Sequence, residues 1–267
     1  MRRRTYISNG NRTSTHGRAA WLLVLLCLVV CAAAAGWVLL RAMDTGATSG
    51  ERASQDETRE WDETVAPNYY QVVGPACFDE VPEVGEVIYE PLDALGRAGR
   101  VIACVDYALM EVGRSREREP TNDLLPSGWG DNAEVEIELP NGNTYHGYFW
   151  NRSHLLAKSL GGEEVIENLV CGTRMQNVGA NVEGVEGGMA YAESLTRDWL
   201  EENPRGSVLY AARPLYRGSE LVCRNVLVDV RSSDGALNFE VLVFNAAKGY
   251  EIDYETGEFR SGELGHE

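Results

Sequence analysis

The chain carries the run Tyr145-His146-Gly147-Tyr148-Phe149-Trp150-Asn151-Arg152-Ser153-His154, and we predict the fold starting from these residues. Its aromatic residues favour a strand over Thr144–Trp150, and the alternation of Val, Ile and Leu with Glu in Glu134–Leu139 favours a second strand. The turn sequence Pro140-Asn141-Gly142-Asn143 separates them, so we expect a β-hairpin. His154 is expected just past the strand, in a polar turn.

The other periodic segments predict an α+β domain with a central antiparallel sheet. Met189–Glu201 has the apolar spacing of an amphipathic helix, and Asn203-Pro204 follows it as a stop signal. Arg100–Val112 is apolar enough to enter the core as either a strand or a helix. Four further segments predict strands: Val84–Tyr89, Ser207–Tyr216, Glu220–Val230 and Asn238–Asn245.

The N-terminal part predicts a membrane anchor. Ala19–Leu40 contains 22 residues without a charge, which as a helix rising about 1.5 Å per residue can cross a hydrocarbon core of about 30 Å. Arginines concentrate before this segment, so the positive-inside rule places residues 1–18 in the cytoplasm and the chain after Met43 outside the cell. The alternative is a signal peptide cleaved near Ala32–Gly36, which would give a secreted protein.

Two regions are expected beyond the anchor. Residues 41–66 are rich in Ser, Thr, Glu, Asp and Arg and lack apolar periodicity, which is typical of a solvated linker. Residues 67–267 are long enough to bury a full hydrophobic core, and we expect them to form one extracellular domain.

Four of the six cysteines lie in the exported part, where disulfides can persist: Cys77, Cys104, Cys171 and Cys223. Three pairings are possible, and we favour Cys77 with Cys104 and Cys171 with Cys223. A zinc site is the alternative, but no Cys-x-x-Cys spacing supports it.

The exported part is strongly acidic. All 41 acidic residues and 18 of the 24 basic residues lie beyond Met43, which gives this part a net charge of −23. A protein that follows phosphates normally displays positive charge along its groove. However, screening acts over about 8–10 Å at physiological ionic strength, and a bound cation inverts the local field. We therefore expect weak nucleic-acid binding that depends strongly on salt and metal.

The positions of the four histidines narrow the choice of a general base. His16 precedes the predicted anchor, His266 lies in the tail, and His146 falls within the predicted strand, where a structural role is expected. This leaves His154, which is followed along the chain by the amide side chain of Asn177. An imidazole that takes a proton from water, beside an amide oxygen that helps to hold a hard cation, suits metal-assisted phosphodiester cleavage.

Five segments, in order along the chain, resemble the DNA/RNA non-specific endonuclease family, and most closely its secreted and surface-anchored bacterial DNases. These segments are Tyr89–Arg100, Pro126–Trp129, Asn151–Leu155, Asn168–Arg174 and Ile252–Gly257. Each segment alone is weak, whereas the ordered set is specific. The resemblance implies a ββα-metal catalytic motif on the antiparallel sheet.

The resemblance also implies roles for individual residues. His154 matches the catalytic histidine, in an Asn-Arg-Ser-His motif where many members have Asp-Arg-Gly-His. Asn177 matches the metal-binding asparagine, and Asn168 resembles a second asparagine that orients groups around the histidine. The implied cation is Mg²⁺, with Mn²⁺ as a substitute.

Three charged residues complete the implied site. Glu193 matches a helix glutamate near the site, and Arg152 and Arg174 are candidate donors to phosphate oxygens. Structural alternatives stay open for some of these residues. Asn168 could cap a turn, Arg174 could form a surface ion pair, and Glu193 could only hold its helix.

The chain departs from the family pattern after the metal-binding asparagine, where Val178–Gly187 forms an insertion. The insertion makes Asn181 a competitor for the metal. Its acidic residues Glu183 and Glu186 are expected to be solvated loop charges, unless they approach the metal as additional ligands.

Together these features predict a metal-dependent endonuclease that acts outside the cell on DNA, with RNA as a second substrate and with little sequence preference. The membrane is contacted through residues 19–40, and no stable protein partner is expected. Two alternatives stay open. One is a catalytically inactive surface module that binds DNA or a protein. The other is a toxin-type nuclease paired with an immunity protein, although the chain shows no delivery domain.

Overall fold

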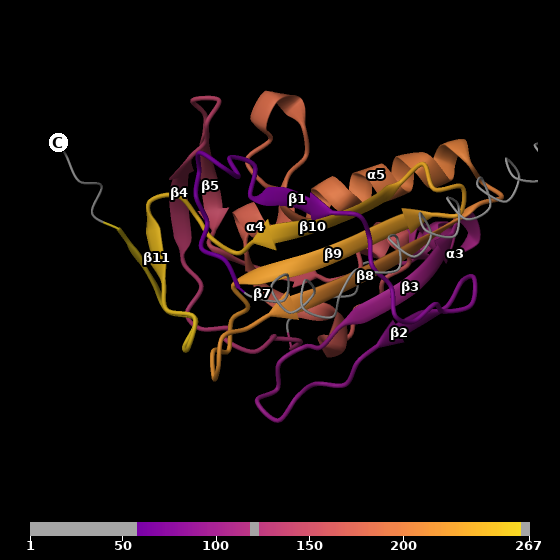
Figure 1. The fold of residues 1–267 in the computed structure, drawn as a ribbon. Helices are drawn as coiled ribbons and strands as arrows, with labels where there is room; N and C mark the ends of the chain where they lie inside the picture. The colour runs from indigo at the N-terminus through magenta and orange to yellow at the C-terminus, as the bar shows by residue number, and fades with distance from the viewer. Residues whose placement is uncertain (1–57, 118–122, 263–267) are drawn as a thin grey trace, which may run out of the picture. The chain divides into compact units, whose positions relative to one another are not determined.

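The computed structural model describes residues 58–117 and 123–262, which form a mixed α and β domain around an antiparallel sheet (Figure 1). The sheet has six strands in the order β1-β10-β9-β8-β3-β2, each antiparallel to its neighbours. The strands are β1 (Tyr70–Gly74), β2 (Val87–Tyr89), β3 (Val101–Asp106), β8 (Ser207–Leu215), β9 (Asn225–Ser232) and β10 (Asn238–Phe244). The predicted α and β composition and the antiparallel sheet are confirmed.

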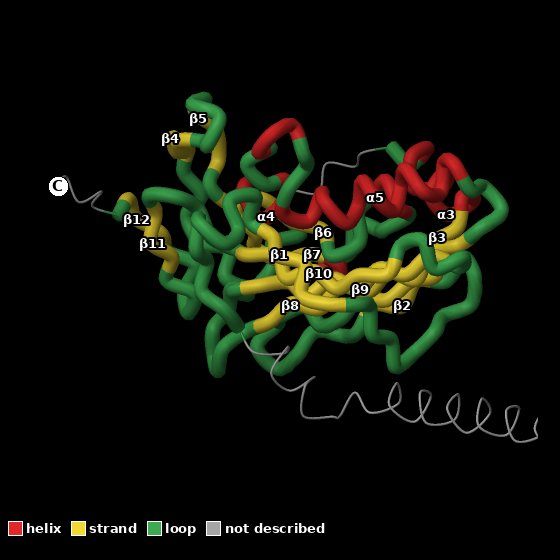
Figure 2. The backbone as a smooth tube through the Cα atoms, turned by 45° about the horizontal axis from the view of Figure 1, so that its top comes forward, coloured by secondary structure: helices red, strands yellow, loops and turns green. Residues whose placement is uncertain are grey.

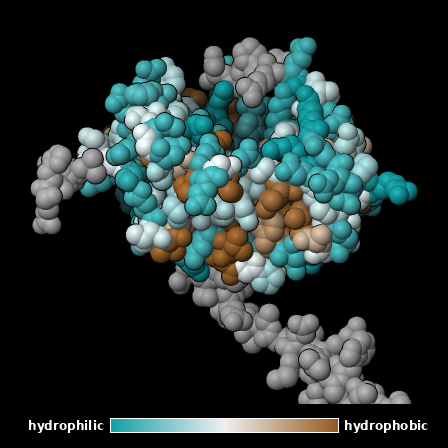
Figure 3. All heavy atoms as spheres, turned by 90° about the horizontal axis from the view of Figure 1, so that it is seen from above, coloured by the Kyte–Doolittle hydropathy of each residue, from teal (hydrophilic) through white to brown (hydrophobic). Residues whose placement is uncertain are grey.

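The central strands of this sheet are covered on both faces. In β9 every residue except Arg231 is buried, including the polar residues Asn225, Asp229 and Ser232. Helices lie over one face and loops over the other (Figure 2). The surface seen from above is mostly hydrophilic, with hydrophobic residues gathered in separate patches (Figure 3).

Two helices pack near this sheet. Helix α5 (Gly188–Glu202) buries Met189, Ala192, Thr196 and Trp199 at helical spacing, which confirms the predicted helix. Arg100–Val112 contains both of the expected elements, because strand β3 runs directly into helix α3 (Tyr107–Ser115). Asp106 lies at this junction, where its side chain accepts a hydrogen bond from Leu109 N and caps the helix.

The predicted hairpin is present, but its second strand ends early. Strand β4 (Glu134–Glu138) pairs with β5 (Thr144–Tyr148), and the chain then changes direction into a new strand, β6 (Trp150–His154). The break follows from packing, because Phe149 and Trp150 are buried in a second hydrophobic cluster. In that cluster Phe149 stacks on Phe259, which belongs to the small hairpin formed by β11 (Tyr250–Ile252) and β12 (Phe259–Ser261). The prediction that His154 lies in a polar turn is therefore wrong, since it is the last residue of β6.

Strand β6 belongs to a separate ββα unit. It pairs antiparallel with β7 (Leu169–Thr173), and β7 leads directly into the short helix α4 (Arg174–Val178). Gly172 in β7 permits the close approach of α4, because a Cβ atom there would lie 2.2 Å from Gln176 Oε1. This unit places the end of β6 and the end of α4 next to each other.

The described part of the predicted linker packs against the domain. Arg59 N donates to Asn225 Oδ1, the ring of Trp61 stacks on Tyr69, and Ala66 is buried. The compact part of the chain therefore begins before residue 67. The predicted anchor at residues 19–40 lies outside the described residues. Within the described ranges, we find no helix of the length and apolar character needed to span a membrane.

The predicted disulfides are wrong, because Cys77, Cys104, Cys171 and Cys223 are all free thiols. Cys77 N donates to Asp229 on β9, whereas Cys104 lies on β3. Strand β8 lies between β9 and β3 in the sheet.

The other cysteine pair is buried. Asn245 Nδ2 donates to the carbonyl oxygens of both Cys171 and Cys223. Burial raises the pKa of each of these two thiols, which disfavours the thiolate that disulfide exchange requires.

Candidate active site

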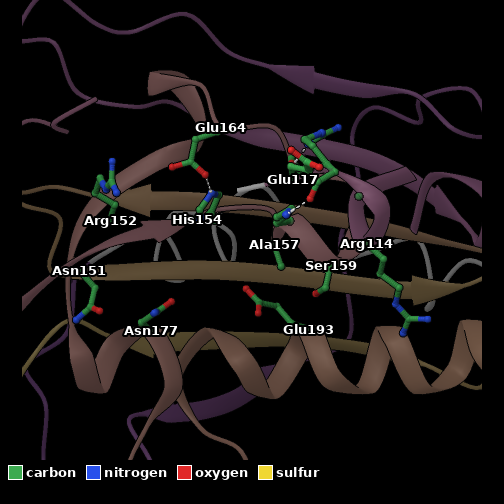
Figure 4. A pocket seen from close by; sticks show the side chains of 14 residues that line it. Arg114, Glu117, Asn151, Arg152, His154, Ala157, Ser159, Glu164, Asn177 and Glu193 are labelled. Carbon is green, nitrogen blue, oxygen red and sulfur yellow. Dashed lines mark hydrogen bonds and ion pairs between the residues drawn. The ribbon is translucent and has the colours of Figure 1, made fainter. Parts of the chain in front are cut away.

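A cavity of about 640 Å³ lies where β6, α4, α5 and the end of α3 come together (Figure 4). Four of the residues predicted from the sequence line it, namely Arg152, His154, Asn177 and Glu193. They come from three elements that are distant in the sequence, so the fold itself brings them together.

Strand β6 supplies two of these side chains. Arg152 and His154 are two positions apart, which places them on the same face of the strand. The His154 side chain is 22% exposed, and its Nε2 lies 2.9 Å from Glu164 Oε2. His154 also pairs with Leu169 at the end of the β6–β7 ladder, so its backbone is fixed where the cavity begins.

Helix α4 supplies Asn177. The helix begins at a good N-cap, because Thr173 Oγ1 accepts a hydrogen bond from Gln176 N. Ser153, whose side chain points away from the Arg152 and His154 face, donates from its hydroxyl to Asn177 Oδ1 at 3.3 Å. This contact links the strand of the histidine to the helix of the amide.

Helix α5 supplies Glu193. Burial raises the pKa of this carboxyl to about 7; the neighbouring Arg197 opposes the rise and Glu186 adds to it. Glu193 and Asn177 project into the cavity from the helical side, opposite His154 (Figure 4). The carboxylate form of Glu193 is therefore costly unless a positive charge enters the cavity.

Asn168 is fully buried and does not line the cavity. It ends the short 3-10 helix η2 (Ile166–Asn168). Its Oδ1 accepts from Leu156 N at 2.8 Å, and its Nδ2 donates to the carbonyl oxygens of Leu156 and Glu163 at 3.0 and 2.8 Å. These bonds fasten the loop that leaves His154 and carries Glu164, which agrees with an orienting role.

Arg174 lies apart from the other predicted residues. It begins α4, and its guanidinium lies over the ring of Tyr145, 5.3 Å from the ring centroid. Burial lowers the pKa of this guanidinium. Arg174 is not among the residues that line the cavity, so its predicted contact with phosphate has no support in this arrangement.

The insertion after α4 folds away from the cavity lining. It contains the short 3-10 helix η3 (Val182–Gly184), and Asn68 fastens it by accepting from Ala180 N and donating to Val185 O. Its side chains Asn181, Glu183 and Glu186 are exposed and do not line the cavity.

His146 also lies away from the cavity. It sits on β5 with a side chain that is 65% exposed, and its Nδ1 lies 3.2 Å from Glu136.

The cavity contains residues that sequence reasoning missed. Glu164 is one, and Arg114, Arg116 and Lys158 form a basic edge. Arg116 Nη1 donates to Gly162 O at 2.6 Å, and Lys158 donates to Arg116 O. The closely spaced Arg114 and Arg116 could have indicated this edge from the sequence, but the prediction considered only the net acidic charge of the exported part.

The chemical capacity of the site follows from its groups. An imidazole can accept a proton, amide and carboxylate oxygens can hold a hard cation, and guanidinium groups can donate to an anion. Asn151 also lines the cavity, and its buried Nδ2 has no hydrogen-bond partner within the described residues. Such a set suits an anionic ester whose hydrolysis is assisted by a cation.

Comparisons with known proteins agree with this chemistry. The family model for DNA/RNA non-specific endonuclease matches residues 79–234. A deoxyribonuclease from Streptococcus dysgalactiae subsp. equisimilis is 33% identical over 229 residues, which cover 73% of this chain and 68% of that protein.

Solved structures show the same likeness. The Sda1 nuclease with a bound zinc ion matches with a TM-score of 0.71 and 33% identity, over 76% of this chain and 100% of the other. NucA from Streptococcus agalactiae with a bound magnesium ion matches with a TM-score of 0.55 and 24% identity, over 72% of this chain and 89% of the other, and supports the fold alone.

Proposed function

The chain belongs to the DNA/RNA non-specific endonuclease family, and we propose that it hydrolyses phosphodiester bonds of DNA, and secondarily of RNA, in a reaction that requires a divalent cation. The observation that carries this proposal is the convergence of His154, Arg152, Asn177 and Glu193 on one cavity. We place the reaction outside the cell, because the sequence predicts an N-terminal anchor with an external domain.

His154 acts as the general base in this proposal. A neutral imidazole can accept a proton from water. It stands at the edge of the cavity on a fixed strand end. Water deprotonated there attacks phosphorus on the side opposite the departing 3′ oxygen.

Asn177 and Glu193 are the groups that would hold the cation. Among the residues that the structure describes, no three His, Cys, Asp or Glu side chains form a metal-binding group, so a closed zinc site does not fit. Magnesium fits better, since it retains several waters and needs only one or two protein oxygens. The raised pKa of Glu193 supports the fit, because a nearby cation would favour its carboxylate. When bound, the cation would stabilise negative charge on the phosphate and on the leaving oxygen.

The remaining donors position the substrate. Arg152 lines the cavity on the same strand face as His154 and can donate two hydrogen bonds to phosphate oxygens. Arg116 and Lys158 extend the positive charge along one edge. These groups would contact the phosphate backbone and not the base edges, so we expect weak sequence preference.

The direct test is the digestion of supercoiled plasmid by the purified full-length chain. We expect nicking and linearisation with Mg²⁺ or Mn²⁺, no cleavage with EDTA, and recovery when Mg²⁺ is restored. Gel-shift binding without any cleavage at every metal tested would instead support the inactive binding module.

A further inference from the structure

The Glu164 side chain meets the imidazole of His154 (Figure 4). Its Oε2 lies 2.9 Å from His154 Nε2, a normal hydrogen-bonding distance. Both side chains are only partly exposed, at 30% for Glu164 and 22% for His154, so water screens their contact less than it would at an open surface. The sequence motifs did not identify Glu164, because a loop returns it to the histidine.

The chemistry of the pair fixes the roles of the two ring nitrogens. An ionised carboxylate can only accept hydrogen bonds, so Nε2 of a neutral imidazole must carry the proton in this contact. The lone pair is then on Nδ1.

We propose that Glu164 is a positioning residue that holds His154 in the Nε2–H tautomer and leaves Nδ1 as the atom that takes the proton from water. The expected effect of Glu164 on cleavage rests on the proposed nuclease function. The hydrogen bond and the tautomer that it selects can be tested without any cleavage.

The loop that carries Glu164 is built to hold it in place. Asn168 Nδ2 donates to Glu163 O and to Leu156 O, which ties the residue before Glu164 to the chain just after His154. Glu163 N also donates to the hydroxyl of Tyr89. Because these contacts use backbone atoms and the Asn168 side chain, replacing the Glu164 side chain should leave the loop intact.

Glu163 offers a matched control. It is the preceding residue of the same loop and carries the same charge, but its side chain is exposed and does not line the cavity. Glu163→Ala therefore removes one acidic side chain from the loop while the backbone contacts remain.

The experiment compares the full-length wild-type chain with Glu164→Ala, Glu164→Gln and Glu163→Ala. One measurement is kcat and KM for DNA cleavage at saturating Mg²⁺. The other is the nitrogen-15 spectrum of labelled histidine in metal-free protein at a pH where His154 is neutral. The chain has four histidines, and the signals of His154 are assigned with His154→Ala.

We expect Glu164→Ala to lower kcat by about 10- to 100-fold, as for other residues that orient a functional histidine, with KM changed by less than about 2-fold. Glu164→Gln, which keeps a neutral acceptor, should fall between Glu164→Ala and wild type. The wild-type spectrum should show the Nε2–H tautomer at His154, and Glu164→Ala should show a mixture. Glu163→Ala should match wild type in both measurements.

Three results would overturn the proposal. The first is an unchanged kcat and tautomer in Glu164→Ala. The second is a rise in kcat, which would mean that Glu164 covers the base nitrogen. The third is an Nδ1–H tautomer in the wild type. A wild-type chain that does not cleave would refute the nuclease function, and the spectrum would still decide whether Glu164 sets the tautomer. If Glu164→Ala fails to fold, Glu164→Gln serves for both measurements.

Discussion

The six-stranded sheet buries rows of aliphatic side chains on both faces, whereas the β6–β7–α4 unit beside it buries hydrogen-bonding side chains among its apolar ones. Val226, Val228 and Val230 of β9 are fully buried in the main core. In and next to the ββα unit, the hydrogen-bonding side chains of Ser153, Asn168, Thr173 and Gln176 are fully buried beside the apolar side chains of Trp150, Leu169 and Met175. Apolar burial is strong but has no direction, while hydrogen bonds fix the orientation of the groups that make them.

The contrast indicates that the sheet provides stability, whereas the polar contacts of the ββα unit position the side chains of the site. Asn168 makes three hydrogen bonds and ties down the loop around His154, and Thr173 caps the helix that presents Asn177. Changes in the sheet should therefore lower stability and spare the chemistry. Changes at the cavity should alter the chemistry and spare the fold.

The largest effect is expected at the base. His154→Ala should keep the fold and lose cleavage by at least about 10²–10⁴-fold, the usual contribution of a general base. His146→Ala is the control, because that exposed side chain pairs with Glu136 outside the cavity. Rates of plasmid nicking and a circular dichroism spectrum measure the two outcomes. An inactive His146→Ala with an active His154→Ala would move the site to the β4–β5 hairpin.

The next effect concerns the cation. Asn177→Ala should abolish turnover or raise the Mg²⁺ concentration that gives half-maximal rate, because a neutral amide and a few waters hold the ion weakly. Asn181→Ala should do little, since its side chain is exposed on the insertion. A magnesium titration of the cleavage rate distinguishes them. Should Asn181→Ala be the defective variant, the metal site would lie in the insertion.

A smaller effect is expected in the pH dependence of stability. The pKa of Glu193 is about 7 in the folded chain, above its ordinary value of 4.5, so the folded state binds this proton more tightly. Stability should fall as pH rises from about 4.5 to 7, by up to about 3 kcal/mol. In EDTA, Glu193→Gln should remove this loss, so the variant gains on wild type at pH 8 relative to pH 5.

The control for this pH effect is Glu202→Gln, an exposed position on the same helix. Urea unfolding at the two pH values is the measurement. Added Mg²⁺ should reduce the difference, because a cation stabilises the Glu193 carboxylate. Parallel pH profiles for wild type and Glu193→Gln would contradict the burial argument.

The smallest effect on catalysis is expected in the sheet. Val228→Ala removes two methyl groups from a fully buried position between Ala212 and Val241. It should lower the free energy of unfolding by about 1–3 kcal/mol and leave kcat within about 2-fold at temperatures where the chain stays folded. Val72→Ala on the edge strand is the control, because Val72 is 48% exposed. A large loss of kcat in folded Val228→Ala would show that the sheet and the cavity are coupled.

The same contrast explains what the sequence could predict. Helix α5 and the β4–β5 hairpin depend on local patterns, namely apolar spacing and a turn sequence, and both are present as expected. The end of β5 was missed because Phe149 and Trp150 are drawn into a core completed by Phe259, far along the chain. Propensity alone favours continuing such an aromatic strand.

A site residue could be predicted where the helix or strand that carries its sequence motif also lines the cavity. His154, Arg152, Asn177 and Glu193 are of this kind. Glu164 and the basic edge could not be predicted, because a loop and the end of α3, which carry none of these motifs, bring them to the cavity. The thiols were mispaired because the spacing of the cysteines along the chain does not reveal that Cys77, Cys104, Cys171 and Cys223 are free.

We propose that one cavity holds both the base and the cation. The most direct test adds paramagnetic Mn²⁺ to histidine-labelled full-length protein and follows the broadening of each histidine signal. We predict that the His154 signals broaden at Mn²⁺ concentrations that leave His146 sharp, over the same range in which cleavage appears, and that Asn177→Ala removes this selectivity. Equal broadening of both histidines, or selective broadening that survives Asn177→Ala, would contradict the claim.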